Sequence, residues 1–126
     1  MKSQYEKKRL ITFDRIKIKS NYKYLLNTKV KFNEMFHSRS GEKIGIFYSS
    51  KDDINIPYNL YIAVSYIKQT LTLEFSSKIL KEKYPDLISR DTIKECLTNI
   101  NQLHICDIDV DSILSNGAIT SVDVTY

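Results

Sequence analysis

Glycine and proline are scarce in this sequence, with only three and two among 126 residues. Linkers between domains are usually built from Gly, Ser or Pro, so the sequence has little material for one. We therefore expect residues 1–126 to form a single domain, with a basic N-terminal arm at residues 1–9. At this length a domain can bury a hydrophobic core without disulfides or bound metal.

Long apolar runs are missing as well. No stretch approaches the roughly 20 apolar residues that a membrane-spanning helix needs. The basic start is followed by Phe13-Asp14-Arg15 rather than by the apolar core of a signal peptide. We therefore expect a cytoplasmic protein without a membrane partner. Cys96 and Cys106 lie among apolar residues and form no CxxC pair, which predicts buried free thiols.

The residue patterns of common enzymes and zinc sites are also missing. His37 and His104 are the only histidines, and there is no HxH, HExxH or Cys/His cluster to supply zinc ligands. Gly41, Gly45 and Gly117 form neither GxxxxGK nor GxGxxG, the loops that bind phosphate groups. We therefore expect a protein that is not an enzyme and has no cofactor.

One acidic run invites a metal interpretation. Asp107, Asp109 and Asp111 alternate with Ile108 and Val110, so on a strand the three carboxylates would share one face. Hard cations such as Mg²⁺ prefer clustered carboxylate oxygens, but the spacing of an EF-hand loop, with its central Gly and terminal Glu, is absent. The same alternation suits an exposed edge strand whose charges discourage aggregation. We favour the edge strand and expect no metal site.

What the sequence does have is a strong separation of charge. Residues 1–51 contain thirteen Lys or Arg and four Asp or Glu, and residues 52–94 contain six of each kind. Residues 95–126 contain five acids and no Lys or Arg, so the formal net charge of +4 hides a basic first part and an acidic last part. A basic region attracts polyanions, which indicates nucleic acid or a nucleoprotein as the partner.

The basic residues of the first part are interleaved with aromatic ones. Lysines stand at alternate positions of two predicted strands, where they would line one sheet face or edge, and the aromatic rings could stack on unpaired bases. The alternative is a solvated lysine face with tyrosines that cover the core. We favour nucleic-acid binding. The candidate residues are Lys7, Lys8, Arg9, Lys17, Lys19, Tyr22, Lys23, Tyr24, Lys29 and Lys31.

The order of hydrophobic patterns predicts an α+β fold with a mainly antiparallel sheet of about five or six strands. In the first strand, a slip of the alternation around Asp14-Arg15 indicates a β-bulge. In the second, Val30 and Phe32 oppose Lys29 and Lys31. Strands are expected at 10–19, 29–32, 43–48, 60–67, 70–75, 105–110 and 118–125.

Two helices are expected to pack on this sheet. The main one covers about 90–103, with Ser89 as its N-cap and an apolar stripe that includes Leu97 and Ile100. A short helix is expected at about 77–84, closed by Pro85.

Three segments of the second half carry a family resemblance. They are LTLEFSSKIL at 71–80, CLTNI at 96–100 followed by ICDIDVD at 105–111, and SVDVT at 121–125. In this order they resemble the N-terminal portion of phage and plasmid replication initiators of the gene II/X type. In that family a strand with the pattern LEFS.KIL precedes a helix, and an Asp-Val-Thr strand follows. The resemblance covers about residues 60–125.

The resemblance also has implications for function. Initiators of this type nick DNA with a metal-binding histidine pair and a nucleophilic tyrosine, and this sequence has no histidine pair. It thus implies a non-catalytic domain from a mobile genetic element. Since small nuclease-free proteins of such elements often act on host nucleoproteins, inhibition of a host CRISPR effector is the expected function. Two alternatives stay open: a truncated initiator domain that binds origin DNA, and a protein–protein interaction module with an acidic tail.

Overall fold

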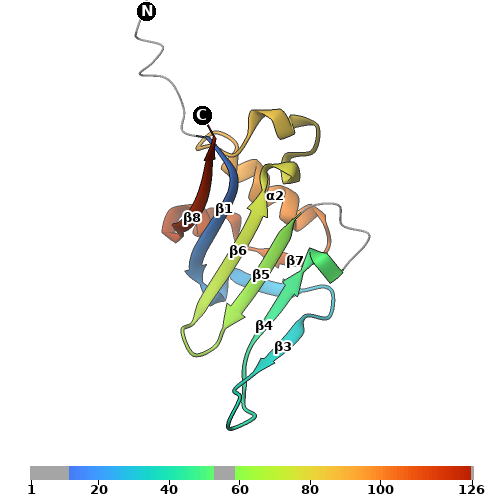
Figure 1. Ribbon diagram of the computed structural model, residues 1–126, viewed down its shortest axis with the longest axis vertical. Helices are drawn as coiled ribbons and strands as arrows, with labels where there is room; N and C mark the ends of the chain where they lie inside the picture. The colour runs from blue at the N-terminus through green and yellow to red at the C-terminus, as the bar shows by residue number, and fades with distance from the viewer. Residues whose placement is uncertain (1–11, 53–58, 126) are drawn as a thin grey trace, which may run out of the picture.

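The computed structural model of the chain describes residues 12–52 and 59–125. Its main element is a six-stranded antiparallel sheet with the strand order β3-β4-β5-β6-β1-β8 (Figure 1). A separate pair, β2 and β7, forms a small second sheet. The predicted α+β fold with a mainly antiparallel sheet is thereby confirmed. The strands are β1 (Thr12–Asn21), β2 (Leu25–Thr28), β3 (Asn33–Phe36), β4 (Lys43–Ser49), β5 (Leu60–Ser65), β6 (Thr70–Ser76), β7 (Cys106–Ile108) and β8 (Ala118–Thr125).

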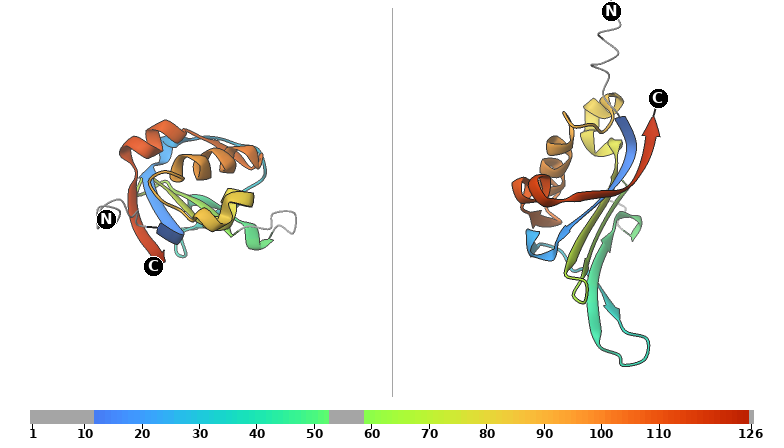
Figure 2. Two further views of the ribbon diagram at one scale, coloured as in Figure 1. Left: turned by 90° about the horizontal axis from the view of Figure 1, so that it is seen from above. Right: turned by 90° about the vertical axis from the view of Figure 1, so that its left-hand side faces the viewer.

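The helices and the small sheet form one layer against a single face of the main sheet. The layer contains α2 (Ile93–Gln102), α3 (Val110–Asn116) and β7, and Figure 2 shows the helices on one side of the sheet in its right-hand view. Three 3-10 segments complete the fold: η1 (Tyr22–Tyr24), η2 (Ser50–Asp52) and η3 (Ser77–Asp86). No element of the described ranges lies across the opposite face, which we call the open face.

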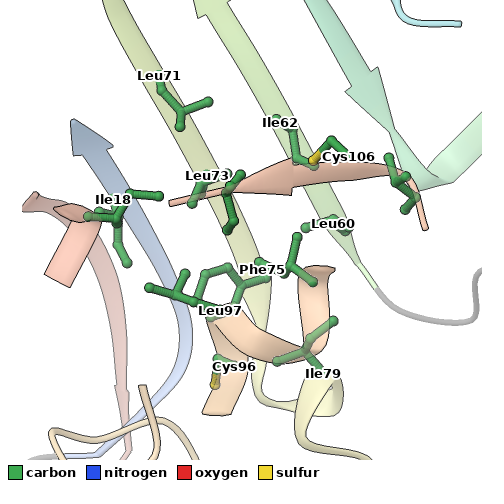
Figure 3. Packing of buried hydrophobic residues seen from close by; sticks show 14 of the residues in the cluster. Ile18, Leu60, Ile62, Leu71, Leu73, Phe75, Ile79, Cys96, Leu97 and Cys106 are labelled. Carbon is green, nitrogen blue, oxygen red and sulfur yellow. The ribbon is translucent and has the colours of Figure 1, made fainter. Parts of the chain in front are cut away.

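Strict alternation along the central strands separates the two faces. In β5, Leu60, Ile62 and Val64 are buried whereas Tyr61 and Ala63 are partly exposed. Successive side chains of a strand point to opposite faces, so the apolar set of each strand reaches the same core. Figure 3 shows this set packed against side chains of α2 and β7. The labelled side chains of the sheet include Ile62, Leu71, Leu73 and Phe75, and those packed against them include Leu97 of α2 and Cys106 of β7.

The bulge predicted in the first strand is confirmed. The pairing of β1 with β8 shifts register between Phe13 and Arg15, so Asp14 is the extra residue. Because one inserted residue reverses the facing of all that follow, Phe13 packs against the core and Ile16 does so as well. Arg15 consequently belongs to the open face.

The main helix is present but shorter than predicted. It runs from Ile93 to Gln102, and Leu97 and Ile100 are fully buried on its inner side. Ser89 still acts at its start: its Oγ accepts from the Asp91 N–H, and its own N–H donates to Thr92 Oγ1. This reciprocal pattern is that of a capping box, placed one turn before the first regular helical residue.

The short helix predicted at about 77–84 is a 3-10 segment, Ser77–Asp86, that continues past Pro85. Lys81 interrupts it with a φ of 60°. The segment is fixed to the main helix instead of being a regular helix itself, since the buried Asn99 of α2 donates from Nδ2 to the Ile79 carbonyl at 2.9 Å.

One strand prediction is wrong and another is too long. The 29–32 strand is absent: Lys29 donates its N–H to the Ile105 carbonyl, and Phe32 is buried beside Tyr48. The chain here passes from the small sheet to the edge of the main one. The strand at 105–110 ends at Ile108, because Asp109 caps the N-terminus of α3.

The acidic last part of the chain is not a tail. It supplies most of α2, all of β7 and α3, and the strand β8 that pairs with β1. The acids of this part therefore lie on helices and strands of the fold.

Candidate nucleic-acid interface

Rows of cross-strand neighbours define the open face. One row runs Ser49, Tyr61, Glu74 and Lys17 across β4, β5, β6 and β1. The next row runs Phe47, Ala63, Thr72 and Lys19 across the same strands. The first row contains Tyr61 and the second contains Phe47, and each includes a lysine of β1. Both rows continue into the edge strand β8, where Ser121 is paired with Lys17 and Ala118 with Lys19. Opposed side chains in such rows have Cβ atoms about 4.5–5.5 Å apart, so neighbours within a row are in contact range.

Phe47 and Tyr61 form an aromatic pair on this face. Their ring centroids lie 6.1 Å apart with an interplanar angle of 32°, and both side chains are partly exposed. The small side chains of Ala63 and Thr72 follow next to Phe47 in its row. A pair of rings beside small residues leaves space for a flat ligand to lie against the aromatic surface.

Charged groups of β1 and β6 border the aromatic pair. Arg15 Nη1 lies 3.9 Å from Glu74 Oε2, and Lys17 Nζ lies 4.0 Å from Glu74 Oε1. All three side chains are between about a third and a half exposed. Lys19 is exposed one row further along β1. Exposed pairs at these distances contribute little to stability.

A pocket of about 380 Å³ opens on this face near the end of β4. Ligand sites typically occupy about 300–1,000 Å³, so the pocket is large enough for a small ligand or one nucleotide. Its lining combines aromatic, hydroxyl, basic and acidic groups. They include Arg15, Phe47, Ser49, Lys51, Tyr61 and Glu74.

The structure divides the residues that the sequence singled out. Lys17 and Lys19 lie together on the open face, because the alternate residues Ile16 and Ile18 are buried in the core. Lys29, in contrast, pairs with Asp107 of β7 at 3.2 Å, in the layer on the other side of the sheet. The predicted surface shared by all four strand lysines therefore does not exist.

The two tyrosines predicted to stack on bases also lie on the other side of the sheet, in the layer of helices and small sheet that we call the covering layer. Tyr22 and Tyr24 of η1 pack against the core, and the Tyr24 hydroxyl accepts from Asn116 Nδ2 of α3. Tyrosines that cover the core were the alternative interpretation of the sequence, and here it holds. Lys23 is exposed within η1, and Lys31 is exposed in the segment before β3. Lys7, Lys8 and Arg9 lie outside the described residues.

The sequence-based site missed Arg15, Phe47, Lys51 and Tyr61. A signal for Tyr61 was present, since it alternates with the apolar Leu60 and Ile62 and so belongs to the face opposite the core. The sequence did not show which side chains would be neighbours in space, because β1 joins the sheet beside β6 through pairing between residues far apart in the chain. Charge along the sequence therefore grouped Lys17 and Lys19 with Lys29, which the fold places in another layer.

The acidic run is distributed over three structural roles. Asp107 pairs with Lys29 and accepts from Asn27 Nδ2. Asp109 caps α3, accepting from the Ser112 N–H and hydroxyl. Asp111 is largely exposed and lies 3.8 Å from Lys94. Within residues 12–52 and 59–125, no group of three or more His, Cys, Asp or Glu side chains that could hold a metal ion is found.

The two cysteines and His37 have structural roles in the core and in a turn. Cys96 and Cys106 are free and fully buried, as predicted, and burial raises the pKa of each thiol to about 12. His37 stands in the β3–β4 turn, where its Nδ1 accepts from the backbone N–H groups of Arg39 and Ser40.

Neither α2 nor another helix in the described part of the chain has the length and apolar character needed to span a bilayer. Comparisons of this chain with protein-family models, with curated proteins and with solved structures found no match.

Proposed function

We propose that this protein binds single-stranded nucleic acid on the open face of its sheet, without catalysing a reaction. The observation that carries the proposal is the presence of the Phe47–Tyr61 pair on the open face together with Arg15, Lys17 and Lys19. Aromatic rings stack on bases of any sequence, and flanking cations neutralise phosphates.

The geometry favours a single strand over a duplex. Rings that lie on a sheet face can stack only on bases that are unstacked, which loops, ends and single strands provide. The lysines stand on β1 and the rings on β4 and β5, so the bases and the backbone of one strand have separate contact zones. A regular duplex would present phosphates to the lysines and leave the rings without a partner.

The sequence analysis motivates two proposals for the biological partner. A strand displaced within a replication origin and a nucleic acid bound by a CRISPR effector both expose unpaired bases. The resemblance to replication initiators motivates the first target, and the mobile-element interpretation motivates the second. The open face suits either one by the same contacts.

The test is binding of a fluorescent 15-nucleotide single strand, measured by anisotropy between about 50 and 200 mM salt. Lys17→Glu/Lys19→Glu should weaken binding at least tenfold. It should also make the fall of log affinity with log salt shallower, by roughly one to two units of slope. Lys78→Glu/Lys94→Glu is the matched control, because it makes the same charge change at exposed positions of the covering layer.

Both double variants lose the same net charge, so any general effect of net charge on affinity is the same in each. Apart from that effect, the control should bind within about twofold of the wild type. Equal losses for both double variants would show that binding follows overall charge and not the open face. An absence of binding by the wild type at low salt, or tighter binding to a duplex, would contradict the proposal.

A further inference from the structure

Glu74 occupies an unusual position for a surface that binds nucleic acid. It lies between Tyr61 and Lys17 in its cross-strand row and lines the pocket near the end of β4. A carboxylate here repels phosphates, so its presence weakens any purely electrostatic binding on this face. Its position next to an aromatic ring suggests contact with the edge of a base.

Two cations lie near the carboxylate oxygens of Glu74 at distances longer than a hydrogen bond. Arg15 approaches Oε2 at 3.9 Å and Lys17 approaches Oε1 at 4.0 Å, and neither distance is short enough for a hydrogen bond. An ionised carboxylate accepts hydrogen bonds at both oxygens and can receive two parallel donors at once. The pocket thus presents a two-point acceptor beside an aromatic surface.

Guanine is the standard base that matches a two-point acceptor. Its Watson–Crick edge carries two adjacent donors, the N1–H and the N2 amino group, whereas cytosine and adenine each offer one amino group there. We infer that the pocket binds an unpaired guanine of the bound strand, stacked on Tyr61 or Phe47 with Glu74 accepting from N1–H and N2–H. This inference rests on the proposed function, which it makes specific for one base.

Cationic side chains around the pocket can contact the phosphates of a guanine nucleotide. Arg15 and Lys51 line the same pocket from β1 and η2, on either side of the aromatic residues. Either side chain can contact the phosphates that flank the base, which offsets the repulsion by Glu74. Recognition of an extruded base by stacking and by its Watson–Crick edge is the usual means of reading single strands.

The experiment compares labelled oligothymidine 12-mers that carry one central dG, dI, dA, dC or dT, with affinities measured by fluorescence anisotropy. The dG strand should bind about 10- to 100-fold tighter than the dT strand, the range for a bidentate contact to a base. The dI strand lacks the N2 amino group and should fall between them.

Glu74→Gln separates base recognition from charge. The amide keeps the size of the side chain but presents one acceptor and one donor, so the preference for dG should fall below about threefold. Loss of a negative charge should at the same time tighten binding of the all-thymidine strand. Glu42→Gln at the β3–β4 turn makes the same charge change at the far end of β4 and should alter neither value.

The outcomes distinguish this inference from the proposed function. Equal binding of all five strands, or a dG preference that survives in Glu74→Gln, would overturn the guanine site and leave single-strand binding in place. Failure of every strand to bind at low salt would overturn both. Preferential binding of an arginine-containing peptide, whose guanidinium also offers two parallel donors, would assign the pocket to a protein partner and overturn the inference.

Discussion

Tyr61 of β5 and Glu74 of β6 are direct cross-strand partners on the open face of the sheet. The register thereby sets a ring that can stack on a base next to a carboxylate that can read the edge of that base. Lys17 follows Glu74 in the same row, one strand further. The side chains that we propose for stacking, base recognition and phosphate contact are thus cross-strand neighbours on three adjacent strands.

The aromatic pair should carry much of the affinity for single strands. Replacement of Phe47 and Tyr61 by Leu removes the stacking surfaces and should cost about 1–3 kcal/mol of binding free energy for each base that loses its ring. Phe36→Leu is the control, since Phe36 is an exposed aromatic residue on the edge strand β3. Anisotropy titrations of the three variants would test this, and equal effects at all positions would refute it.

Residues on the inner side of α2 should dominate stability. Leu97→Ala and Ile100→Ala each remove a fully buried side chain and should lower the free energy of unfolding by about 2–5 kcal/mol. Gln102→Ala, at the exposed end of the same helix, should change it by less than about 0.5 kcal/mol. Urea denaturation monitored by circular dichroism gives these values, and a small effect at Leu97 would contradict the packing of α2 on the sheet.

The acidic run should behave as separate structural groups and not as a ligand cluster. Asp109→Ala removes the N-cap of α3 and should destabilise the protein by about 0.5–2 kcal/mol. Asp111→Ala removes an exposed carboxylate 3.8 Å from Lys94 and should have almost no effect. Thermal melts of the two variants would show the difference. Equal destabilisation, or a melting temperature that rises with added Mg²⁺, would indicate a shared role instead.

Alkaline pH should destabilise the protein partly through its thiols. Burial, and secondly the nearby Glu95 and Asp107, raises the pKa of Cys96 and Cys106 from 9.0 to about 12. The folded state therefore holds these protons where the unfolded chain has lost them. Stability is fully present below about pH 9 and falls as pH rises from there towards 12.

The pH dependence is measurable as the urea midpoint at pH 8 and pH 10. Cys96→Ala/Cys106→Ala should lose less stability over this interval than the wild type, because the alanines have no proton to release. All other side chains are the same in both proteins, so their contributions cancel in the comparison. An identical loss in both proteins would show that the thiols do not contribute.

Local patterns predicted most of the elements correctly. The alternation in β5 and β6 and the apolar stripe of α2 depend on neighbours in the sequence, and both are read directly from the residues. The bulge at Asp14 was also visible, since the alternation itself slips there. Errors arose where the chain changes layer, at 29–32, and where a side-chain cap ends a strand, at Asp109.

The candidate interface was less predictable for a physical reason. Charge along the sequence grouped Lys17 and Lys19 with Lys29, but the fold places Lys29 in the covering layer beside Asp107. The residues that accompany Lys17 come instead from β4, β5 and β6, and long-range strand pairing brings them together. Residues far apart in the sequence become neighbours across such pairings, so the sequence did not show which side chains surround Lys17 and Lys19.

Photo-crosslinking is the most direct test of the central claim that the open face binds the strand. A single-stranded oligonucleotide that contains 5-iodouracil would be irradiated in complex with the protein, and the linked residue would be identified by mass spectrometry. The structure predicts crosslinks at Phe47 or Tyr61. Crosslinks confined to Tyr22 or Tyr24, in the layer on the opposite side of the sheet, would contradict it and restore the surface that the sequence alone suggested.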